Sequence, residues 1–292
     1  MSNKKVIVTC ALTGVLTDPV KFNVPVTPDE MANAALQAYN AGASIVHCHF
    51  RHQKEGFRHL PTWEIETVGA IIDAIKDKVP DIIINMSTGV MGDDISGPLE
   101  CLKAFKPCMA ACNAGSLNYL KVRKDGSWAW PPLLFDNPVQ KIKNFLDVML
   151  ENNIVPEFEC FDVGIVRSVN LFKSNKMFKG SPHVSFVMGV ESGMPARSDL
   201  IPILIDELPK NSHWQTIVTG SAYKKHWDVH KTSIELGGDV RTGLEDTFYL
   251  PNGDKADNNG QLVEALVSIV REFGKEVATT FEAREILGIS KK

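Results

Sequence analysis

Hydrophobic positions along the chain alternate between short, β-branched runs and longer segments with helical spacing. The short runs predict buried strands, because strands of a parallel sheet are apolar on both faces. Eight such strands are expected: Lys5–Ala11, Ser44–Phe50, Ile82–Ser87, Met109–Asn113, Val155–Phe161, His183–Met188, Trp214–Val218 and Asp239–Leu244.

The segments between these runs carry helix signals, and the clearest begins at Thr27. Thr27 suits an N-cap, Pro28 suits the first helical position, and Glu30 completes a capping box. This helix is expected to end before Gly42. Further helices are predicted at Trp63–Lys78, Pro138–Asn152, Arg197–Leu208 and Ala222–Leu236, with two more in Asn258–Lys292, the second of them opening near Thr279.

Strands separated by helices imply right-handed crossovers and a parallel sheet. Eight βα units over about 250 residues fit a TIM (β/α)8 barrel better than an open doubly wound sheet. No linker divides the chain, so residues 1–292 are expected to form a single TIM-barrel domain with a C-terminal helical extension. The segment Lys121–Asn137 is expected to be a long loop after the fourth strand.

Composition excludes several other classes of protein. With 44% hydrophobic residues the chain is too apolar to be disordered, and its net charge of −4 lacks the basic excess of a nucleic-acid binder. No uncharged apolar run reaches the roughly 18 residues of a membrane span. The six cysteines form no C-x-x-C pair, which argues against a zinc ribbon or a disulfide framework. A reduced, cytoplasmic protein that binds neither nucleic acid nor membrane is therefore expected.

The first candidate for chemistry is the pair of histidines in the second strand. His47 and His49 share one face of that strand, whereas Cys48 points to the other. Their side chains lie about 7 Å apart along the strand and can converge on one metal ion. The pair falls at the carboxyl end of a strand, where barrel active sites lie. The alternative is two histidines that hydrogen-bond within a layer of the barrel.

The second candidate is the run that ends the eighth strand. In a closed barrel only the first strand separates this strand from the second, so Glu245 could complete a His-His-Glu site with an open position for substrate. Arg241 and Asp246 are expected to form an ion pair that offers a base, with the arginine lowering the aspartate pKa. The alternative is a surface turn with a solvated acidic pair.

Further polar candidates lie in the fifth predicted strand and in the long loop after the fourth. Glu157 and Glu159 share a strand face, so at least one is expected at the barrel mouth. Lys121 and Arg123, near Trp128 and Trp130, could line an entrance for a phosphate-bearing ligand, or could cover a loop or an oligomer contact.

A second histidine pair lies in a predicted helix. His226 and His230, at i,i+4 spacing, could bind a metal, but a solvated helix face is favoured.

Seven motifs in order along almost the whole chain resemble the β-keto acid cleavage enzyme family, which includes the 3-keto-5-aminohexanoate cleavage enzymes. The H-x-H and R-x-G-x-E-D motifs are specific in combination. The motifs are T-C-A-L-T-G, V-P-V-T-P-D-E, G-A-S-I-V-H-C-H-F-R, N-M-S-T-G, N-A-G-S-L-N, G-G-D-V-R-T-G-L-E-D and A-T-T-F-E-A-R-E-I-L-G.

The resemblance implies an acyltransferase with one Zn²⁺ per chain and acetyl-CoA as co-substrate. It would join a β-keto acid to acetyl-CoA and release acetoacetate and a new acyl-CoA by Claisen and retro-Claisen steps. It also implies a homo-oligomer, a dimer or a tetramer. By this resemblance, zinc ligands are His47, His49 and Glu245, the base dyad is Asp246 with Arg241, and substrate contacts are Ser87, Asn113 and Glu159.

Three positions depart from the family pattern. Leu16 stands where amino-substrate members carry a glutamate, which argues against a 5-amino substrate unless Asp18 takes that role. His52 replaces a common aspartate, and Asp239 replaces a common histidine. Two other hypotheses stay open: a metal-dependent TIM-barrel hydrolase of the amidohydrolase type, which also uses H-x-H, and a non-enzymatic metal-binding barrel.

Overall fold

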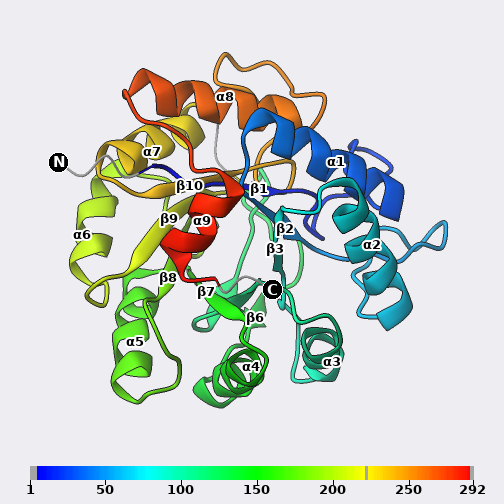
Figure 1. The fold of residues 1–292 in the computed structure, drawn as a ribbon, viewed down its shortest axis with the longest axis horizontal. Helices are drawn as coiled ribbons and strands as arrows, with labels where there is room; N and C mark the ends of the chain where they lie inside the picture. Colours follow the sequence, from blue (N-terminus) through cyan, green and yellow to red (C-terminus); the bar gives the residue numbers. More distant parts are fainter. Residues whose placement is uncertain (1–4, 221–222, 290–292) are drawn as a thin grey trace.

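The computed structural model describes residues 5–220 and 223–289 and contains a closed parallel barrel (Figure 1). The strand order around the barrel is β1-β10-β9-β8-β7-β4-β3-β2, so β1 lies between β10 and β2. The predicted TIM-barrel fold is confirmed. Its strands are β1 (Val8–Ala11), β2 (Ile45–Cys48), β3 (Ile83–Met86), β4 (Met109–Asn113), β7 (Val155–Cys160), β8 (His183–Met188), β9 (His213–Val218) and β10 (Asp239–Thr242).

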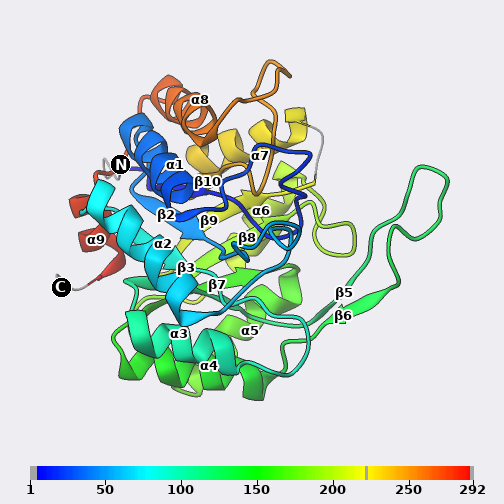
Figure 2. The same cartoon turned by 90° about the vertical axis from the view of Figure 1, so that its right-hand side faces the viewer.

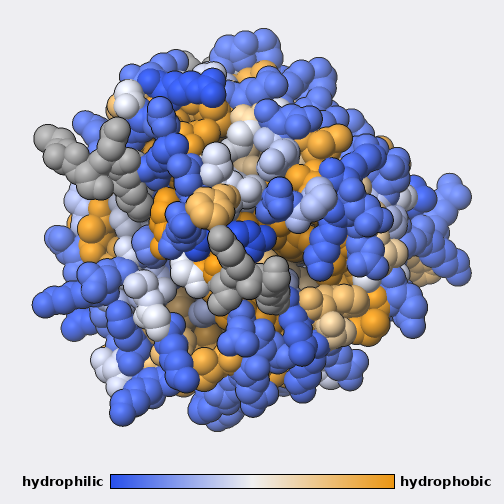
Figure 3. All heavy atoms as spheres, viewed as in Figure 1, coloured by the Kyte–Doolittle hydropathy of each residue, from blue (hydrophilic) through white to orange (hydrophobic). Residues whose placement is uncertain are grey.

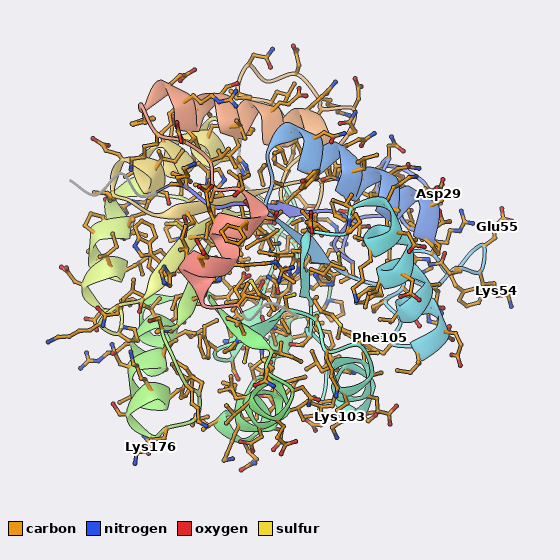
Figure 4. The ribbon with its side chains drawn as sticks, in the orientation of Figure 1. Asp29, Lys54, Glu55, Lys103, Phe105 and Lys176 are labelled. Atoms are coloured by element: carbon orange, nitrogen blue, oxygen red, sulfur yellow. The ribbon has the colours of Figure 1, made fainter. Side chains whose placement is uncertain are left out.

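Helices surround the strands and bury their apolar faces against them. Figure 4 shows polar side chains such as Asp29 and Lys103 directed outward from this ring, and Figure 3 shows hydrophilic side chains over most of the same face. The helices are α1 (Pro28–Ala41), α2 (Ile65–Lys78), α3 (Ser96–Phe105), α4 (Val139–Glu151), α5 (Val163–Ser174), α6 (Ile201–Asp206, after a 3₁₀ turn at Ser198–Leu200), α7 (Tyr223–Glu235), α8 (Asn259–Glu272) and α9 (Thr280–Leu287).

Helix α9 closes the end of the barrel where the strands begin. The predicted capping box of α1 is present, and a second one starts α9, where the Thr279 side chain accepts from the Glu282 N–H. The predicted pair of C-terminal helices is therefore confirmed within the described residues. An apolar plug forms between α9 and the strand starts, from Ile7, Ile45, Ile83 and Met109 on one side and Ala283, Leu287 and Ile289 on the other.

The loop expected at Lys121–Asn137 is largely a hairpin arm. Strands β5 (Leu117–Tyr119) and β6 (Leu133–Phe135) pair antiparallel, and Figure 2 shows the arm projecting from the body. Tyr119 stacks on Trp130, and the Arg123 guanidinium donates to the carbonyls of Trp128 and Ala129. These contacts within the arm, rather than a regular polar pattern, give the segment its structure.

Two helices were missed by the sequence pattern. Helix α3 begins with Ser-Gly-Pro, and α5 is rich in β-branched valine and isoleucine, so neither segment has high helix propensity. Packing against the barrel overrides these local preferences. In α5, Asp162 supplies an N-cap that accepts from the Ile165 N–H.

The expectation for His226 and His230 is wrong. Both side chains are buried, 1% and 0% exposed, on the face of α7 that packs against β9 and β10. His226 Nδ1 donates to the Val218 carbonyl over 2.8 Å, and His230 Nδ1 lies 3.0 Å from Thr216 Oγ1. Burial lowers the pKa of His226 to about 4. No helix in the described part of the chain is long and apolar enough to cross a membrane.

Candidate metal centre and active site

The structure brings His47, His49 and Glu245 together at the carboxyl end of the barrel. His47 lies in β2, His49 follows that strand, and Glu245 lies in the turn after β10. One ligand atom from each residue lies within 4.8 Å of the others. Glu245 Oε1 is 3.4 Å from His49 Nε2 and 3.8 Å from His47 Nε2. The predicted juxtaposition of the second and eighth strands across β1 is confirmed.

The unpaired polar atoms of this cluster suit a metal ion. In the described structure both ring nitrogens of buried His47, and Oε2 of Glu245, have no hydrogen-bond partner. Buried polar atoms are rarely left so, and such an exception needs a chemical reason. Burial lowers the pKa of His47 well below its usual value, which keeps the imidazole neutral and able to coordinate. Two imidazoles and one carboxylate are the donor set of catalytic zinc sites that keep an open position.

Arg241 organises three carboxylates beside this cluster. Its Nε and Nη2 donate to Oδ2 and Oδ1 of Asp246, each over 3.0 Å. Nη2 also donates to Glu245 Oε1 over 2.6 Å, and Nη1 lies 3.4 Å from Glu159 Oε1. Although burial alone would raise the pKa of Glu245, the Arg241 cation and the two histidines hold it well below its usual range. Glu245 is therefore held as an anion, the form that binds a metal.

The expected lowering of the Asp246 pKa is wrong in direction. Burial raises the pKa of this carboxyl to about 7 and outweighs the opposing effect of Arg241, while the charge of Glu245 raises it further. Burial likewise raises the pKa of Glu159 to about 8. A carboxylate with a pKa near neutrality is a stronger base than an ordinary aspartate, as proton abstraction requires.

Ser87, Asn113 and Glu159 stand on neighbouring parts of the barrel rim. Asn113 ends β4 and pairs in register with Glu159 of β7, and Ser87 directly follows β3. A Cβ at Gly89 would lie 3.6 Å from Asn113 Nδ2 and 3.8 Å from Ser87 Oγ, so both polar groups border the same small space. Glu157 lies deeper and accepts hydrogen bonds from Ser185 and Gln215, so Glu159 is the glutamate that reaches Arg241.

Arg51 is a buried residue whose role the sequence reasoning missed. Its Nε donates to the Gly14 carbonyl over 2.9 Å, and Nη2 donates to the Thr13 carbonyl over 3.3 Å. Gly14 lies directly against Glu245, since a Cβ there would be 2.8 Å from Glu245 Cγ. Arg51 therefore fixes the Thr13–Gly14 backbone, against which the candidate metal ligand Glu245 packs. The sequence feature that could have indicated this role is the position of Arg51, two residues after the H-x-H motif.

Comparison with known proteins gives matches along nearly the full chain. The family model described as beta-keto acid cleavage enzyme matches residues 5–289. The 3-keto-5-aminohexanoate cleavage enzyme of Acetoanaerobium sticklandii is 35% identical over 290 residues, which cover 99% of this chain and 100% of that protein. The 3-oxoadipate:acetyl-CoA acetyltransferase of Cupriavidus necator is 29% identical over 289 residues, covering 97% of this chain and 94% of that protein.

Solved structures support the fold. The apo structure of ObcA has a TM-score of 0.72 at 19% identity, with 92% of this chain and 66% of that chain covered. At this identity the likeness concerns the barrel alone. The family model and the full-length similarity to curated relatives go further: this chain is an enzyme that belongs to the β-keto acid cleavage enzyme family.

Proposed function

We propose that the enzyme is zinc-dependent and exchanges the acyl group of a β-keto acid with acetyl-CoA, releasing acetoacetate and a new acyl-CoA. The observation that carries this proposal is the His47–His49–Glu245 cluster beside the Arg241–Asp246 pair. Two relatives that name acetyl-CoA in their reactions support it: the acetyltransferase of Cupriavidus necator and the 3,5-dioxohexanoate:acetyl-CoA acetone transferase of Paraburkholderia graminis.

In this proposal His47, His49 and Glu245 hold one Zn²⁺ per chain. When bound, the ion supplies a Lewis acid for the carbonyl group of the keto acid. Arg241 keeps the Glu245 carboxylate ionised and oriented through its hydrogen bond to Oε1. Ser87, Asn113 and Glu159 contact the substrate from the neighbouring part of the barrel rim, formed by the ends of β3, β4 and β7.

Asp246 takes the proton from C2 of the β-keto acid, while the Arg241 fork fixes the orientation of its carboxylate. The C2 electron pair attacks the thioester carbonyl of acetyl-CoA and expels the CoA thiolate. The thiolate then attacks the original keto carbon, and the bond between C2 and that carbon breaks. Asp246 returns its proton to C2, so acetoacetate and the new acyl-CoA leave with atoms and charge balanced.

The substrate is proposed to be a β-keto acid without a 5-amino group. Leu16, 74% exposed on the loop that follows β1, offers no charge to pair with an ammonium group. Family membership counts against the amidohydrolase-type alternative, because the model that matches residues 5–289 describes an enzyme that cleaves β-keto acids. A cytoplasmic homo-oligomer is also part of this proposal.

The test is incubation of zinc-loaded protein with acetyl-CoA and a panel of β-keto acids that differ in side-chain length and charge. Acetoacetate and the matching acyl-CoA should appear in equal amounts by mass spectrometry. A protein that binds zinc stoichiometrically but converts no member of the panel would contradict the proposal. Product formed without CoA would favour a hydrolase instead.

A further inference from the structure

Asn259 is a buried side chain that joins the two turns at the metal centre. It is the first residue of α8 and is 1% exposed. Its Oδ1 accepts from the Leu244 N–H over 2.9 Å, and its Nδ2 donates to the Leu12 carbonyl over 3.0 Å. Leu244 directly precedes Glu245, so the Asn259 amide hydrogen-bonds to the backbone next to a candidate metal ligand.

The backbone N–H of Leu244 needs a hydrogen-bond acceptor from another element, because β10 ends at Thr242 and its ladder of strand hydrogen bonds stops there. Gly243 turns the backbone away from β10 at φ +144°, and a Cβ there would lie 2.1 Å from the Ala11 carbonyl oxygen. The Glu245 N–H returns to that same carbonyl over 3.3 Å. Between them the buried Leu244 N–H has no strand partner, and an unpaired buried N–H is costly. Asn259 supplies its acceptor.

The second hydrogen bond of Asn259, to the Leu12 carbonyl, reaches the loop after β1 that borders the site. Leu12 leads into Thr13 and Gly14, and Gly14 is the surface on which the Glu245 side chain rests. The Leu12 N–H in turn donates to the carbonyl of His47 over 3.1 Å. The Asn259 amide therefore links the ends of β1 and β10. Through Leu12 it is also connected to β2, the strand that carries His47.

The helix that carries Asn259 is itself firmly placed. Asn258 caps α8 by accepting from the Gln261 N–H over 3.1 Å, and α8 packs closely on α1, where a Cβ at Gly260 would lie 3.2 Å from Gln37 Cβ. The amide is thus presented from a rigid element. We propose that Asn259 is a positioning residue for the metal ligand Glu245 and that it sets the affinity of the site for zinc; this rests on the proposed function of that site.

The experiment measures zinc affinity rather than turnover. The dissociation constant of Zn²⁺ is obtained by chelator competition for wild type, Asn259→Ala and Asn259→Asp, with unfolding temperatures recorded alongside. Loss of a partner that orients a metal ligand typically weakens binding about 10–100-fold, which is expected for Asn259→Ala. Asn259→Asp keeps the acceptor for Leu244 but loses the donor to Leu12, so an intermediate loss is expected. The absorption spectrum of the Co²⁺-loaded proteins should change in the same order.

Asn137→Ala is the matched control. Asn137 is also buried and donates its amide to a backbone carbonyl, that of Gly115, over 3.3 Å, but it has no contact with the ligands. It should lose stability and keep the wild-type zinc dissociation constant. Folded Asn259 variants that bind zinc as wild type would overturn the positioning role; if Asn259→Ala does not fold, Asn259→Asp alone decides. Wild-type protein that binds no zinc would instead defeat the proposed metal site.

Discussion

Arg241 and Asp246 are joined by two parallel hydrogen bonds of equal length, 3.0 Å each, in the interior of the barrel mouth. The same guanidinium donates to Glu245 and approaches Glu159, so one side chain contacts three carboxyl groups. A bidentate fork of this kind orients its partner as well as pairing with it. The proposed base and a proposed metal ligand are therefore positioned by one side chain.

Arg241→Lys should damage both activity and stability. Lysine keeps the charge but cannot form the planar fork, so the buried carboxylates lose shared hydrogen bonds. Breaking a buried ion pair costs about 3–5 kcal/mol when a partner is removed, and Arg241→Gln is expected to approach that loss in urea unfolding. The control is Arg197→Lys, which alters a solvent-exposed pair with Asp199 and should change stability little. Equal effects at both positions would contradict this account.

Asp246→Asn should abolish most turnover while zinc remains bound. Asparagine has nearly the same shape but cannot accept the C2 proton, and a positioned base contributes about 10²–10⁴-fold in rate. The measurement is kcat for acyl-CoA formation together with metal content. A variant that retains zinc and more than a tenth of the wild-type rate would show that another group acts as the base.

Gly14→Ala should weaken zinc binding. The new methyl group would meet Glu245 Cγ at 2.8 Å, and the residue already has φ +59°, so the carboxylate must move. The matched control is Gly56→Ala, which has φ +81° but nothing within 4 Å of its Cβ. Both variants carry backbone strain, so only Gly14→Ala should show a weaker zinc dissociation constant in chelator competition. Equal zinc affinity in the two would refute the contact.

His226 should make the fold less stable as the solution becomes acidic. Its pKa is about 4 in the folded protein because the ring is buried, against about 6.5 when unfolded. Between these two pH values the unfolded chain binds a proton at His226 that the folded chain does not. The contribution of neutral His226 to the free energy of unfolding is therefore fully present above about pH 6.5 and is lost as the pH falls toward 4. Over the whole window it amounts to about 3 kcal/mol.

The comparison that isolates this effect is wild type against His226→Gln in urea unfolding from pH 4 to 7. Glutamine can still donate to the Val218 carbonyl but does not titrate. His230 is buried beside it and shifts in the same direction, while Asp246 and Glu159 shift in the opposite direction, so only the difference between the two proteins is informative. Parallel stability curves for the two proteins would contradict the prediction.

Short-range patterns in the sequence were enough to predict the barrel and the core of its site. Alternation along a strand places His47 and His49 on one face, and the capping residues Thr27 and Glu30 start a helix, because both effects act within a few residues. The closed order of strands then brings Glu245 beside the histidines, and this needs only the strand count.

Burial and long-range hydrogen bonds could be known only from the folded chain. The pKa of Asp246 rises because desolvation exceeds the attraction of Arg241, and no local pattern reports how deeply a carboxyl is buried. Helix α7 turns His226 toward β9 because packing selects its inner face. Asn259 bridges residues 12 and 244, which are remote in sequence, so its role exists only once α8 packs over the ends of β1 and β10.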